Sequence, residues 1–468
     1  MSNNWYPCSD LTGGGDGALD ALDGAAIVDG DRAFVISSGE VAFYILNATS
    51  AATEISPHII SPDSNADSKR WILTGSIPGS FLEFEYYNST YPITTGEQAA
   101  ITLLDSFARG KNHTISPKVS AGLTAISCAI LSGDSNSITE ISTGLTVVCG
   151  GLNNSVLAAD KCIIGGGSSN YIEGTGDTIN CTICGGLSNY IEGDEAGAID
   201  GSTICGGMSN YIDCYGMACF VGGGSANYIE GNALINCDYC TICGGKGNSI
   251  YGSGNDHTIS GGKYNEISAS GDGVFIGGGL ANEVAGQYGV VAGGKYNEVS
   301  ADYGYISGGT SAIAYLYGQS AQSTGIQTSG KSQVSNLVCG NSTTDATITE
   351  LFLDSSHTER AVLPDSRMWK FTVDLAAMQT GGTSGTVGDS AFWTITGGIK
   401  RDSADNTVLV GTPQGAGVPG ANDRDVAAAA WSISVVADDT NESLKIAVTG
   451  EIDKSVNWVA KISLVEVG

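Results

Sequence analysis

The feature that most constrains the fold is a short pattern, Gly-Gly-x-x-Asn-x-Ile/Val, which recurs through the middle of the chain. The stretch TICGGLSNYIEG at residues 182–193 returns as TICGGMSNYIDC at 203–214, with the glycine and asparagine positions unchanged. A weaker copy begins at Asn136, and YISGGTSAIA ends the array without the asparagine. The asparagines of the full copies are Asn154, Asn170, Asn189, Asn210, Asn227, Asn248, Asn265, Asn282 and Asn297.

Each copy predicts two short strands that are joined by a bend at the glycine pair. The residue two before the first glycine is always β-branched, as is the residue two after the asparagine, and such residues favour strands. A single copy has too little apolar surface to form a core, but stacked copies bury a continuous one. The interval between asparagines varies from 15 residues (Asn282 to Asn297) to 21 (Asn189 to Asn210), which fits outward loops between coils. We therefore expect a parallel β-solenoid.

The alternation of side chains along a strand assigns faces to each coil. If Ile191 points inward, Asn189 does so too, while Tyr190 and Glu192 point outward. An inward column of asparagines can form hydrogen bonds from coil to coil. The glycine pair would provide a bend with positive φ and a close approach of backbones. We therefore expect the repeated asparagines to form a structural ladder.

Two outward columns are candidates for ligand binding. Stacked tyrosines beside stacked carboxylates could hold sugar rings and hydroxyls, or the carboxylates could share a cation such as Ca²⁺. The alternative is that the tyrosines pack against a neighbouring chain and the acids are merely solvated. In later copies Lys263 with Glu266, and Lys295 with Glu298, suggest surface ion pairs. The candidate residues are Tyr171, Tyr190, Tyr211, Tyr228, Glu173, Glu192, Asp213 and Glu230.

The cysteines do not predict a metal site. CTIC occurs at 181–184 and 240–243, but residues three apart on a strand face opposite sides and chelate poorly. We expect instead a buried column of small apolar residues, with a covalent staple between coils or chains as the alternative. Neither the four histidines nor any other residues form a nucleophile or metal motif. We predict no catalytic residues, no metal and no cofactor beyond the stacked-carboxylate Ca²⁺ hypothesis. The proposed cysteine column is Cys149, Cys184, Cys205 and Cys243.

The flanks of the repeats predict further β-rich parts. We expect an N-terminal β-rich attachment module at 1–95, the repeat region at 96–315, a neck at 316–345 and an antiparallel β-sandwich tip at 346–468. In the tip, two expected strands each carry an apolar face. These faces are Trp431, Ile433 and Val435 on one strand, and Leu444, Ile446 and Val448 on the other.

The net charge of the chain limits the classes of partner that it can bind. The chain has 49 acidic and 20 basic residues, a net charge of −29, which disfavours nucleic acid and anionic membranes. Its first residues, MSNNWYPCSDLTGGG, lack the basic and apolar regions of a signal peptide, and no run of apolar residues is long enough to span a membrane. We expect folding in a cytoplasm and no membrane insertion.

The repeats resemble the left-handed parallel β-roll heads of YadA-like trimeric adhesins, which also occur in phage and prophage tail fibres. The resemblance covers roughly residues 130–315 and implies a homotrimer. TDATITELFLDSS followed by RAVLPDSRMWKF resembles the C-terminal domain of a group of phage and prophage tail proteins, where the tip commonly contacts the receptor. The N-terminal segment is similar to modules that join a fibre to the particle, which implies other tail or baseplate proteins as partners.

Together these features predict a virion tail-fibre-like homotrimer that is assembled in the host cytoplasm and acts extracellularly. It would bind a host surface receptor, a glycan or a protein, without catalysis. One alternative is a tailspike polysaccharide depolymerase, since stacked carboxylates could flank a glycosidic bond. Another is a purely structural filament or decoration protein.

Overall fold

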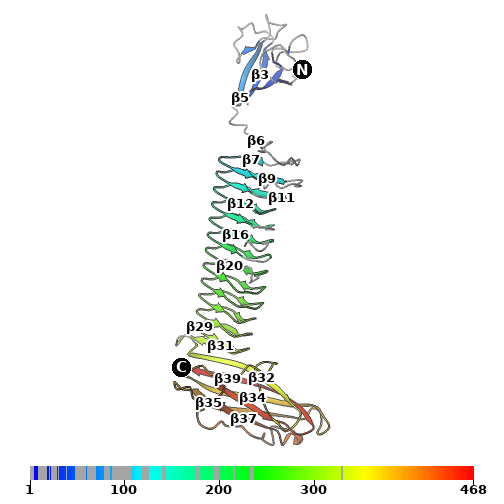
Figure 1. Ribbon diagram of the computed structural model, residues 1–468, viewed down its shortest axis with the longest axis vertical. Coiled ribbons are helices and arrows are strands. Elements are labelled where there is room, and N and C mark those ends of the chain that lie inside the picture. Colours follow the sequence, from blue (N-terminus) through cyan, green and yellow to red (C-terminus); the bar gives the residue numbers. More distant parts are fainter. Residues whose placement is uncertain are drawn as a thin grey trace, which may run out of the picture. The chain divides into compact units, whose positions relative to one another are not determined.

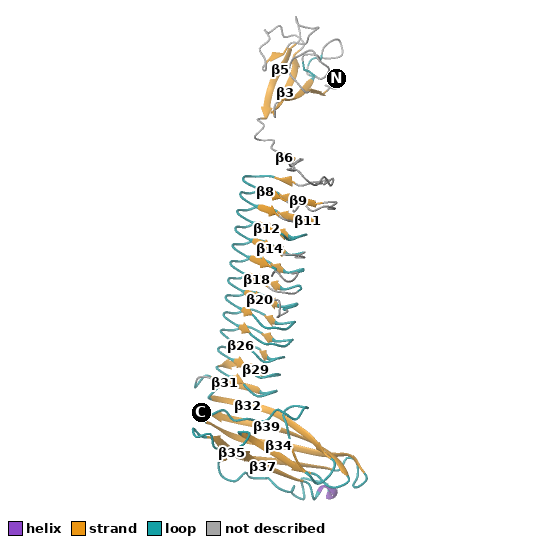
Figure 2. Cartoon of the chain, viewed as in Figure 1, coloured by secondary structure: helices purple, strands orange, loops and turns teal. Residues whose placement is uncertain are grey.

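The structure is a computed structural model in which the described secondary structure consists of β-strands and one short 3₁₀ helix (Figures 1 and 2). The chain divides into two compact units, residues 1–88 with 107–109, and residues 89–106 with 110–468. None of the described segments forms a helix that is long and apolar enough to cross a membrane. The described residues are 5–8, 18–19, 22, 29, 31–37, 40–47, 59–60, 70–77, 85–86, 107–116, 126–139, 144–174, 180–193, 200–213, 217–231, 237–327 and 330–468.

The first unit contains a small sheet with strand order β1-β2-β3-β5-β4. Strands β2 and β3 form an antiparallel hairpin, and the outermost β1 pairs in parallel with β2. Trp71 and Tyr44 are the largest side chains of its core and are almost fully buried. The strands are β1 (Trp5–Cys8), β2 (Arg32–Ser37), β3 (Glu40–Asn47), β4 (Ile59–Ile60) and β5 (Arg70–Ile77), with the short pair β6 (Glu85–Tyr86) and β7 (Phe107–Ala108).

The repeats form the rungs of a parallel β-solenoid, which Figure 1 shows as a stack of similar coils. One ladder, called the first ladder here, comprises β9 (Ile126–Ile130), β11 (Gly144–Val148), β13 (Ile163–Ile164), β15 (Thr182–Ile183), β17 (Thr203–Ile204), β19 (Phe220–Val221), β21 (Thr241–Ile242), β23 (Thr258–Ile259), β25 (Phe275–Ile276), β27 (Val290–Val291), β29 (Tyr305–Thr310) and β31 (Ser320–Thr324). Its strands pair in parallel from rung to rung.

The second ladder contains 12 parallel strands and so rises roughly 50 Å. Between the two ladders, single-residue parallel bridges such as Leu187 to Met208 form a third line of contact. The second ladder comprises β8 (Thr114–Ser116), β10 (Ser137–Thr139), β12 (Ser155–Leu157), β14 (Tyr171–Glu173), β16 (Tyr190–Glu192), β18 (Tyr211–Asp213), β20 (Tyr228–Glu230), β22 (Ser249–Ile250), β24 (Glu266–Ile267), β26 (Glu283–Val284), β28 (Glu298–Val299) and β30 (Ile313–Ala314).

The β-branched positions of the repeat form the solenoid core. Ile183 of the first ladder and Ile191 of the second are fully buried, as are their counterparts in the other rungs. Stacking therefore buries an isoleucine or valine from each strand of β9 to β29, as the sequence predicts, and alanine in the last two, and the expected parallel solenoid is confirmed. The handedness of the roll and its trimeric state stay predictions.

The second glycine of each pair has no room for a side chain. Gly207 has φ +89°, and a Cβ there would clash with the carbonyl oxygen of Gly224 in the next rung. The residue before the asparagine is also left-handed: Ser209 has φ 56°, although it is not glycine. Each rung thus contains two tight bends on either side of the bridge residue, and the close approach of coils explains the constant glycine.

Beyond the solenoid, two antiparallel sheets pack face to face. The larger has the order β32-β39-β34-β35-β36, and the smaller has the order β33-β38-β37. Both apolar faces predicted from the sequence lie in their shared core, which confirms the sandwich. The strands are β32 (Ser332–Thr343), β33 (Ile348–Glu350), β34 (Arg367–Gly382), β35 (Ser390–Arg401), β36 (Thr407–Leu409), β37 (Ser432–Asp438), β38 (Ser443–Thr449) and β39 (Lys454–Val467); a short 3₁₀ helix spans Val426–Ala428.

The segment 316–345 joins the solenoid directly to the sandwich. Strand β31 stacks in parallel on the solenoid strand β29, and β32 then runs antiparallel to both β31 and β39. The buried carboxylate of Glu466 accepts hydrogen bonds from Ser335 and from the Nε2 atoms of Gln333 (3.1 Å) and Gln319 (3.3 Å). Tyr315 also donates to it. This junction ties the last rung to the final strand of the chain.

Candidate functional site

The outward columns of the solenoid are positioned by an internal asparagine ladder. Asn210 is fully buried, and its Nδ2 donates to the carbonyl oxygens of Gly206 (2.8 Å) and Gly224 (3.2 Å) and to Oδ1 of Asn189 (3.1 Å). Its backbone nitrogen donates to the same Oδ1 at 3.1 Å. Each asparagine thus links its own bend to the rungs on both sides. The network fixes the register that aligns the outward side chains.

The ladder ends differently at its two ends. At the N-terminal end, Nδ1 of His113 takes the place of an asparagine oxygen and accepts from the backbone nitrogen of Asn136 at 3.2 Å. At the C-terminal end, Oδ1 of Asn297 accepts from the backbone nitrogen of Ala312 at 3.0 Å. At each end, the ladder position is therefore hydrogen-bonded within the chain.

The four predicted tyrosines form one stack on the second ladder. Ring centroids are 4.8 Å apart for Tyr171 and Tyr190, 5.0 Å for Tyr190 and Tyr211, and 4.8 Å for Tyr211 and Tyr228. Neighbouring rings cover one another, and the ring of Tyr251 lies beside Tyr228 with centroids 6.4 Å apart, so mainly the ring edges and hydroxyls face a ligand. The structure thus brings the four predicted tyrosines together, but the faces of the inner rings are covered and cannot stack on a sugar.

The carboxylates lie in register with the tyrosines. Glu173 pairs with Glu192, Glu192 with Asp213, and Asp213 with Glu230 on successive strands. The hydroxyl of Tyr190 donates to Oε2 of Glu173 at 3.0 Å. Tyr211 likewise donates to Glu192. A carboxylate has two oxygens and can accept several hydrogen bonds, so Glu173 and Glu192 can also accept hydrogen bonds from hydroxyl groups of a ligand.

The tyrosines stay neutral in this setting. Burial, together with nearby carboxylates, raises the pKa of Tyr228 to about 12. The pKa values of Tyr190 and Tyr211 are also raised, by burial first and then by their hydrogen bonds to Glu173 and Glu192. At neutral pH the phenols are therefore donors and the carboxylates acceptors, a mixed surface of the kind that polar, uncharged ligands contact.

A further carboxylate column continues the second ladder, and the sequence analysis did not identify it. Glu266, Glu283 and Glu298 lie in register on successive strands. The pKa values of Glu266 and Glu298 are raised by partial burial and by the charge of Glu283. The recurring NEI and NEV stretches were the available signal. Among the described residues no group of three or more His, Cys, Asp or Glu side chains is arranged to hold a metal ion.

The predicted ion pairs of the later rungs are wrong. No ion pair joins Lys263 to Glu266 or Lys295 to Glu298 among the described side chains. Instead, Nζ of Lys263 lies 4.7 Å from the ring centroid of Tyr264, and Lys295 has the same relation to Tyr296. The intervening tyrosine is left-handed, with φ 58° at Tyr264, so the bend places the lysine and the glutamate on different sides of the rung.

The predicted buried cysteine column is also wrong. Cys184, Cys205 and Cys243 are exposed and Cys149 is half-buried, because each directly follows an inward isoleucine or valine and so points outward. A different column is buried, at the position before the first-ladder strands. It includes Cys162, Cys181, Cys219 and Cys240.

A second side-chain ladder lies at the corner before the first ladder. Oδ1 of Asp238 accepts from the backbone nitrogen of Met217 (2.7 Å), Oδ1 of Asn255 from that of Asp238 (3.1 Å), and Oδ1 of Asp272 from that of Asn255 (2.8 Å). The sequence analysis missed this ladder because aspartate, asparagine and other residues alternate there. Its effect is structural, since each oxygen caps the preceding rung.

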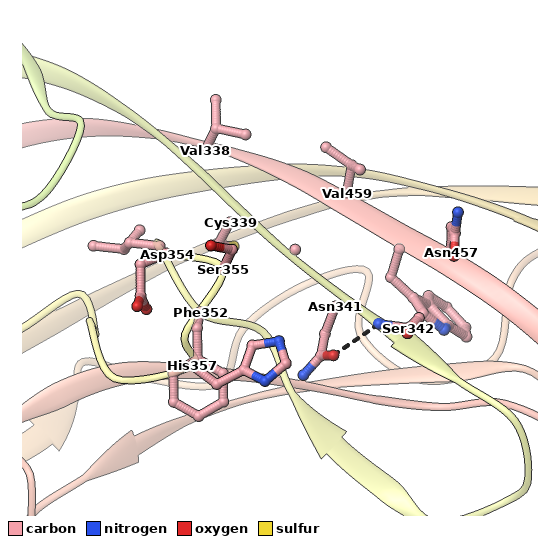
Figure 3. A pocket seen from close by; sticks show the side chains of 13 residues that line it. Val338, Cys339, Asn341, Ser342, Phe352, Asp354, Ser355, His357, Asn457 and Val459 are labelled. Carbon is pink, nitrogen blue, oxygen red and sulfur yellow. Dashed lines mark hydrogen bonds between the residues drawn. The ribbon is translucent and has the colours of Figure 1, made fainter. Parts of the chain in front are cut away.

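The sandwich contains a shallow pocket of about 450 Å³ between β32, β39 and the loop that follows β33 (Figure 3). The rings of Phe352 and His357 lie together with centroids 5.5 Å apart, and the guanidinium of Arg360 lies 4.8 Å from the Phe352 ring. Asn341 and Asn457 add amides to the lining. Asp354 accepts hydrogen bonds from its own loop, including 2.7 Å from the backbone nitrogen of Glu359, so its role is to shape the loop.

The chain matches no protein-family model and no curated protein. Among solved structures it is similar to a tailspike, gp49 of the Acinetobacter baumannii bacteriophage Fri1, described as a capsular polysaccharide depolymerase, with 8% identity over 98% of both chains and a TM-score of 0.19. It is also similar to the tailspike of Acinetobacter phage vB_ApiP_P1, with 11% identity over all of both chains and a TM-score of 0.24. For the A. baumannii phage AM24 tailspike the values are 9% identity, 96% of this chain, 92% of that chain and 0.23. These values do not place the chain in one family with those tailspikes.

Proposed function

We propose that this protein is a homotrimeric, tail-fibre-like virion protein that binds a glycan on the host cell surface without cleaving it. The observation that carries the proposal is the outward column of phenols and carboxylates, which repeats once per rung at about 4.8 Å along the second ladder. A one-dimensional array of identical polar groups suits an extended polymer with a repeating unit, such as a surface polysaccharide.

The chemistry of the column indicates what kind of glycan fits. Its carboxylates accept hydrogen bonds from hydroxyls, and its neutral phenols can donate or accept. The net charge of −29 repels strongly anionic polymers. The ligand we propose is therefore a neutral or amino-sugar-containing polysaccharide, whose hydroxyls meet the edge of the tyrosine stack.

The remaining parts of the chain fit the same role. The resemblance of the repeats and of the C-terminal stretch to tail proteins supports a virion component. The N-terminal unit, with its own core around Trp71, would attach to other tail or baseplate proteins. The protein would be assembled in the host cytoplasm and act outside the cell.

The test is binding of purified protein to immobilised capsular polysaccharides and lipopolysaccharides from a panel of bacteria. We expect at least one neutral polysaccharide to bind, and we expect a double variant with Glu192→Gln and Asp213→Asn to bind it at least tenfold more weakly. Glu283→Gln, a carboxylate on the same ladder but outside the tyrosine stack, is the matched control and should bind normally. Undiminished binding by the double variant would remove the column as the ligand site.

The same experiment distinguishes the alternatives. A depolymerase is favoured only by the rung-to-rung carboxylate pairs, whose spacing of about 5 Å is close to that of retaining glycosidases. Release of reducing ends from the bound polysaccharide would establish that activity and contradict simple binding. Incorporation into particles without binding to any cell would indicate a purely structural filament or decoration protein.

A further inference from the structure

The described outward side chains of the first ladder carry no charge from β13 to β29. They stand at two positions in each rung that flank the buried isoleucine or valine. We call this surface the neutral face. Its residues are Ile163, Gly165, Thr182, Cys184, Thr203, Cys205, Phe220, Gly222, Thr241, Cys243, Thr258, Ser260, Phe275, Gly277, Val290, Ala292, Tyr305 and Ser307.

The absence of charge from this face contrasts with the rest of the solenoid. The outward positions of the second ladder carry seven carboxylates, which are Glu173, Glu192, Asp213, Glu230, Glu266, Glu283 and Glu298. The bridge positions carry Lys246, Lys263 and Lys295. With a net charge of −29, two copies of the chain repel each other wherever their carboxylates meet. The neutral face is the side on which another copy can approach without that repulsion.

The two columns of the neutral face balance each other in size. A large residue in the first column stands beside glycine in the second: Ile163 with Gly165, Phe220 with Gly222, and Phe275 with Gly277. Threonine stands beside cysteine or serine in the rungs between. A Cβ on Gly277 would lie 3.4 Å from Cε1 of Phe275, so the ring lies over the glycine. From Ile163 to Phe275 each bulky residue is thus offset by a neighbouring glycine, whereas Tyr305 stands beside Ser307. Where this offset holds, a similar surface can pack against the face.

Several side chains of this face are too apolar to be left in water without cost. Ile163 is 44% exposed, Phe275 38% and Tyr305 43%, and the thiols of Cys184 and Cys205 are exposed beside them. The cores of protein interfaces are depleted in charge and rich in such residues. In a ring of copies, the bulky column of one chain can pack against the small column of the next, which is a heterologous contact that closes.

We infer that the neutral face is the surface through which copies of this chain associate. This inference rests on the proposed homotrimer and specifies how it assembles, with the tyrosine–carboxylate columns left facing outward. It predicts that a charge placed on the neutral face separates the chains, and that the same charge on the second ladder does not.

The test compares the native masses of three forms of the full-length chain. We expect the unaltered protein to have the mass of about three 47.6 kDa chains, and a variant carrying Thr203→Glu and Thr241→Glu to be monomeric with an unchanged β-sheet circular dichroism spectrum. Ser268→Glu adds the same group at an exposed position of the second ladder and should stay trimeric. A trimeric double variant would overturn the assignment of the face while leaving the trimer itself intact. A monomeric unaltered protein would overturn both.

A second measurement does not depend on tolerance of new charges. A short bismaleimide should join chains of the unaltered protein through the outward thiols of the first ladder, and replacement of these four cysteines by serine should abolish the joined species on a denaturing gel. The four are Cys149, Cys184, Cys205 and Cys243. A trimer that is not joined by the reagent, or that is joined equally well without these thiols, would contradict the proposed interface.

Discussion

The hydroxyl of Tyr190 donates a hydrogen bond to Oε2 of Glu173, 3.0 Å away and one rung nearer the N-terminus. Tyr211 bonds in the same direction to Glu192. The outward columns are thus linked diagonally, each phenol to the carboxylate of the preceding rung. This link couples the ionisation of the tyrosines to the charge of the glutamates beside them.

Replacing Glu192 should shift the ionisation of three tyrosines at once. Glu192 accepts from Tyr211, and its charge also raises the pKa values of Tyr190 and Tyr228. Glu192→Gln should therefore lower all three, measured by absorbance of phenolate in an alkaline titration. Because the pKa values of these tyrosines are raised in the folded protein, their protonated hydroxyls stabilise the fold fully below a pH of about 10. This contribution is lost as the pH rises through the folded pKa values. Glu298→Gln, lower on the same ladder, should leave the titration unchanged; an equal shift there would contradict the coupling.

Loss of one ladder asparagine should destabilise the solenoid. Asn210→Ala removes the donor to Gly206, Gly224 and Asn189, and it leaves the backbone nitrogen of Asn227 without its acceptor. Since the site is fully buried, we expect a loss of about 1–3 kcal/mol in the free energy of unfolding, measured by denaturant titration. Ser209→Ala at the adjacent exposed position is the control. Equal stability of the two variants would show that the ladder contributes nothing.

Two glycines allow a matched test of the bend. Gly207 has φ +89°, and a Cβ there would clash with the next rung, whereas Gly293 has no atom within 4 Å of an added Cβ and no positive φ. Gly207→Ala should cost about 1–3 kcal/mol from the backbone conformation alone. Gly293→Ala should be neutral or slightly stabilising, by up to about 1 kcal/mol. The midpoints of thermal unfolding of the two variants are the measurement. Equal destabilisation by both would indicate a general intolerance of alanine rather than a requirement for glycine at the bend.

The carboxylate column of Glu266, Glu283 and Glu298 should make the free energy of unfolding fall as the pH rises through mildly acidic values. The raised pKa values of Glu266 and Glu298 mean that the folded protein holds their protons more tightly than the unfolded chain does. Their favourable contribution is complete below the ordinary pKa of about 4.3 and is lost as the pH rises through the folded values. Glu283→Gln removes the repelling charge and should stabilise the protein at pH 7, with a smaller effect near pH 4. A pH-independent effect would contradict this account.

The junction between solenoid and sandwich depends on one buried carboxylate. Glu466→Ala removes the shared acceptor of Tyr315, Gln319, Gln333 and Ser335. A buried donor that loses its acceptor costs up to about 3 kcal/mol. We therefore expect a clear fall in the midpoint of thermal unfolding. Val465→Ala, next on the strand and 53% exposed, should change it little. Similar midpoints for the two variants would remove Glu466 as the organising residue.

The solenoid could be predicted from the sequence because its signal is repeated. The alternation around Ile191 placed Asn189 inward and Tyr190 outward, as the structure has them. Applied to Cys184, the same alternation gives an outward thiol; its small size instead suggested burial, and that inference was wrong. Small residues there reflect the close approach of rungs, since a Cβ on Gly165 would clash with the carbonyl oxygen of Cys184.

Other features depend on backbone angles that sequence spacing does not reveal. Lys263 and Glu266 are three residues apart, a spacing that suggests a surface pair, but the left-handed Tyr264 separates their side chains. The pocket beside His357 needs β32, β39 and a loop from three separate stretches of chain, and none of them carries a repeated pattern. The sequence therefore predicts the rungs well and the non-repeating contacts poorly.

The direction of the asparagine ladder bears on how the array stops. Every rung presents acceptors to the next, so an uncovered last rung would be a template for the first rung of another molecule, and molecules could add end to end as fibrils do. In this chain the backbone nitrogen of Ala312 donates to Oδ1 of Asn297, the last asparagine of the ladder. Strand β32 then pairs antiparallel with β31, so the parallel stacking ends there. The sandwich therefore ends the solenoid: the last rung is followed by antiparallel strands, and no further rung can add there.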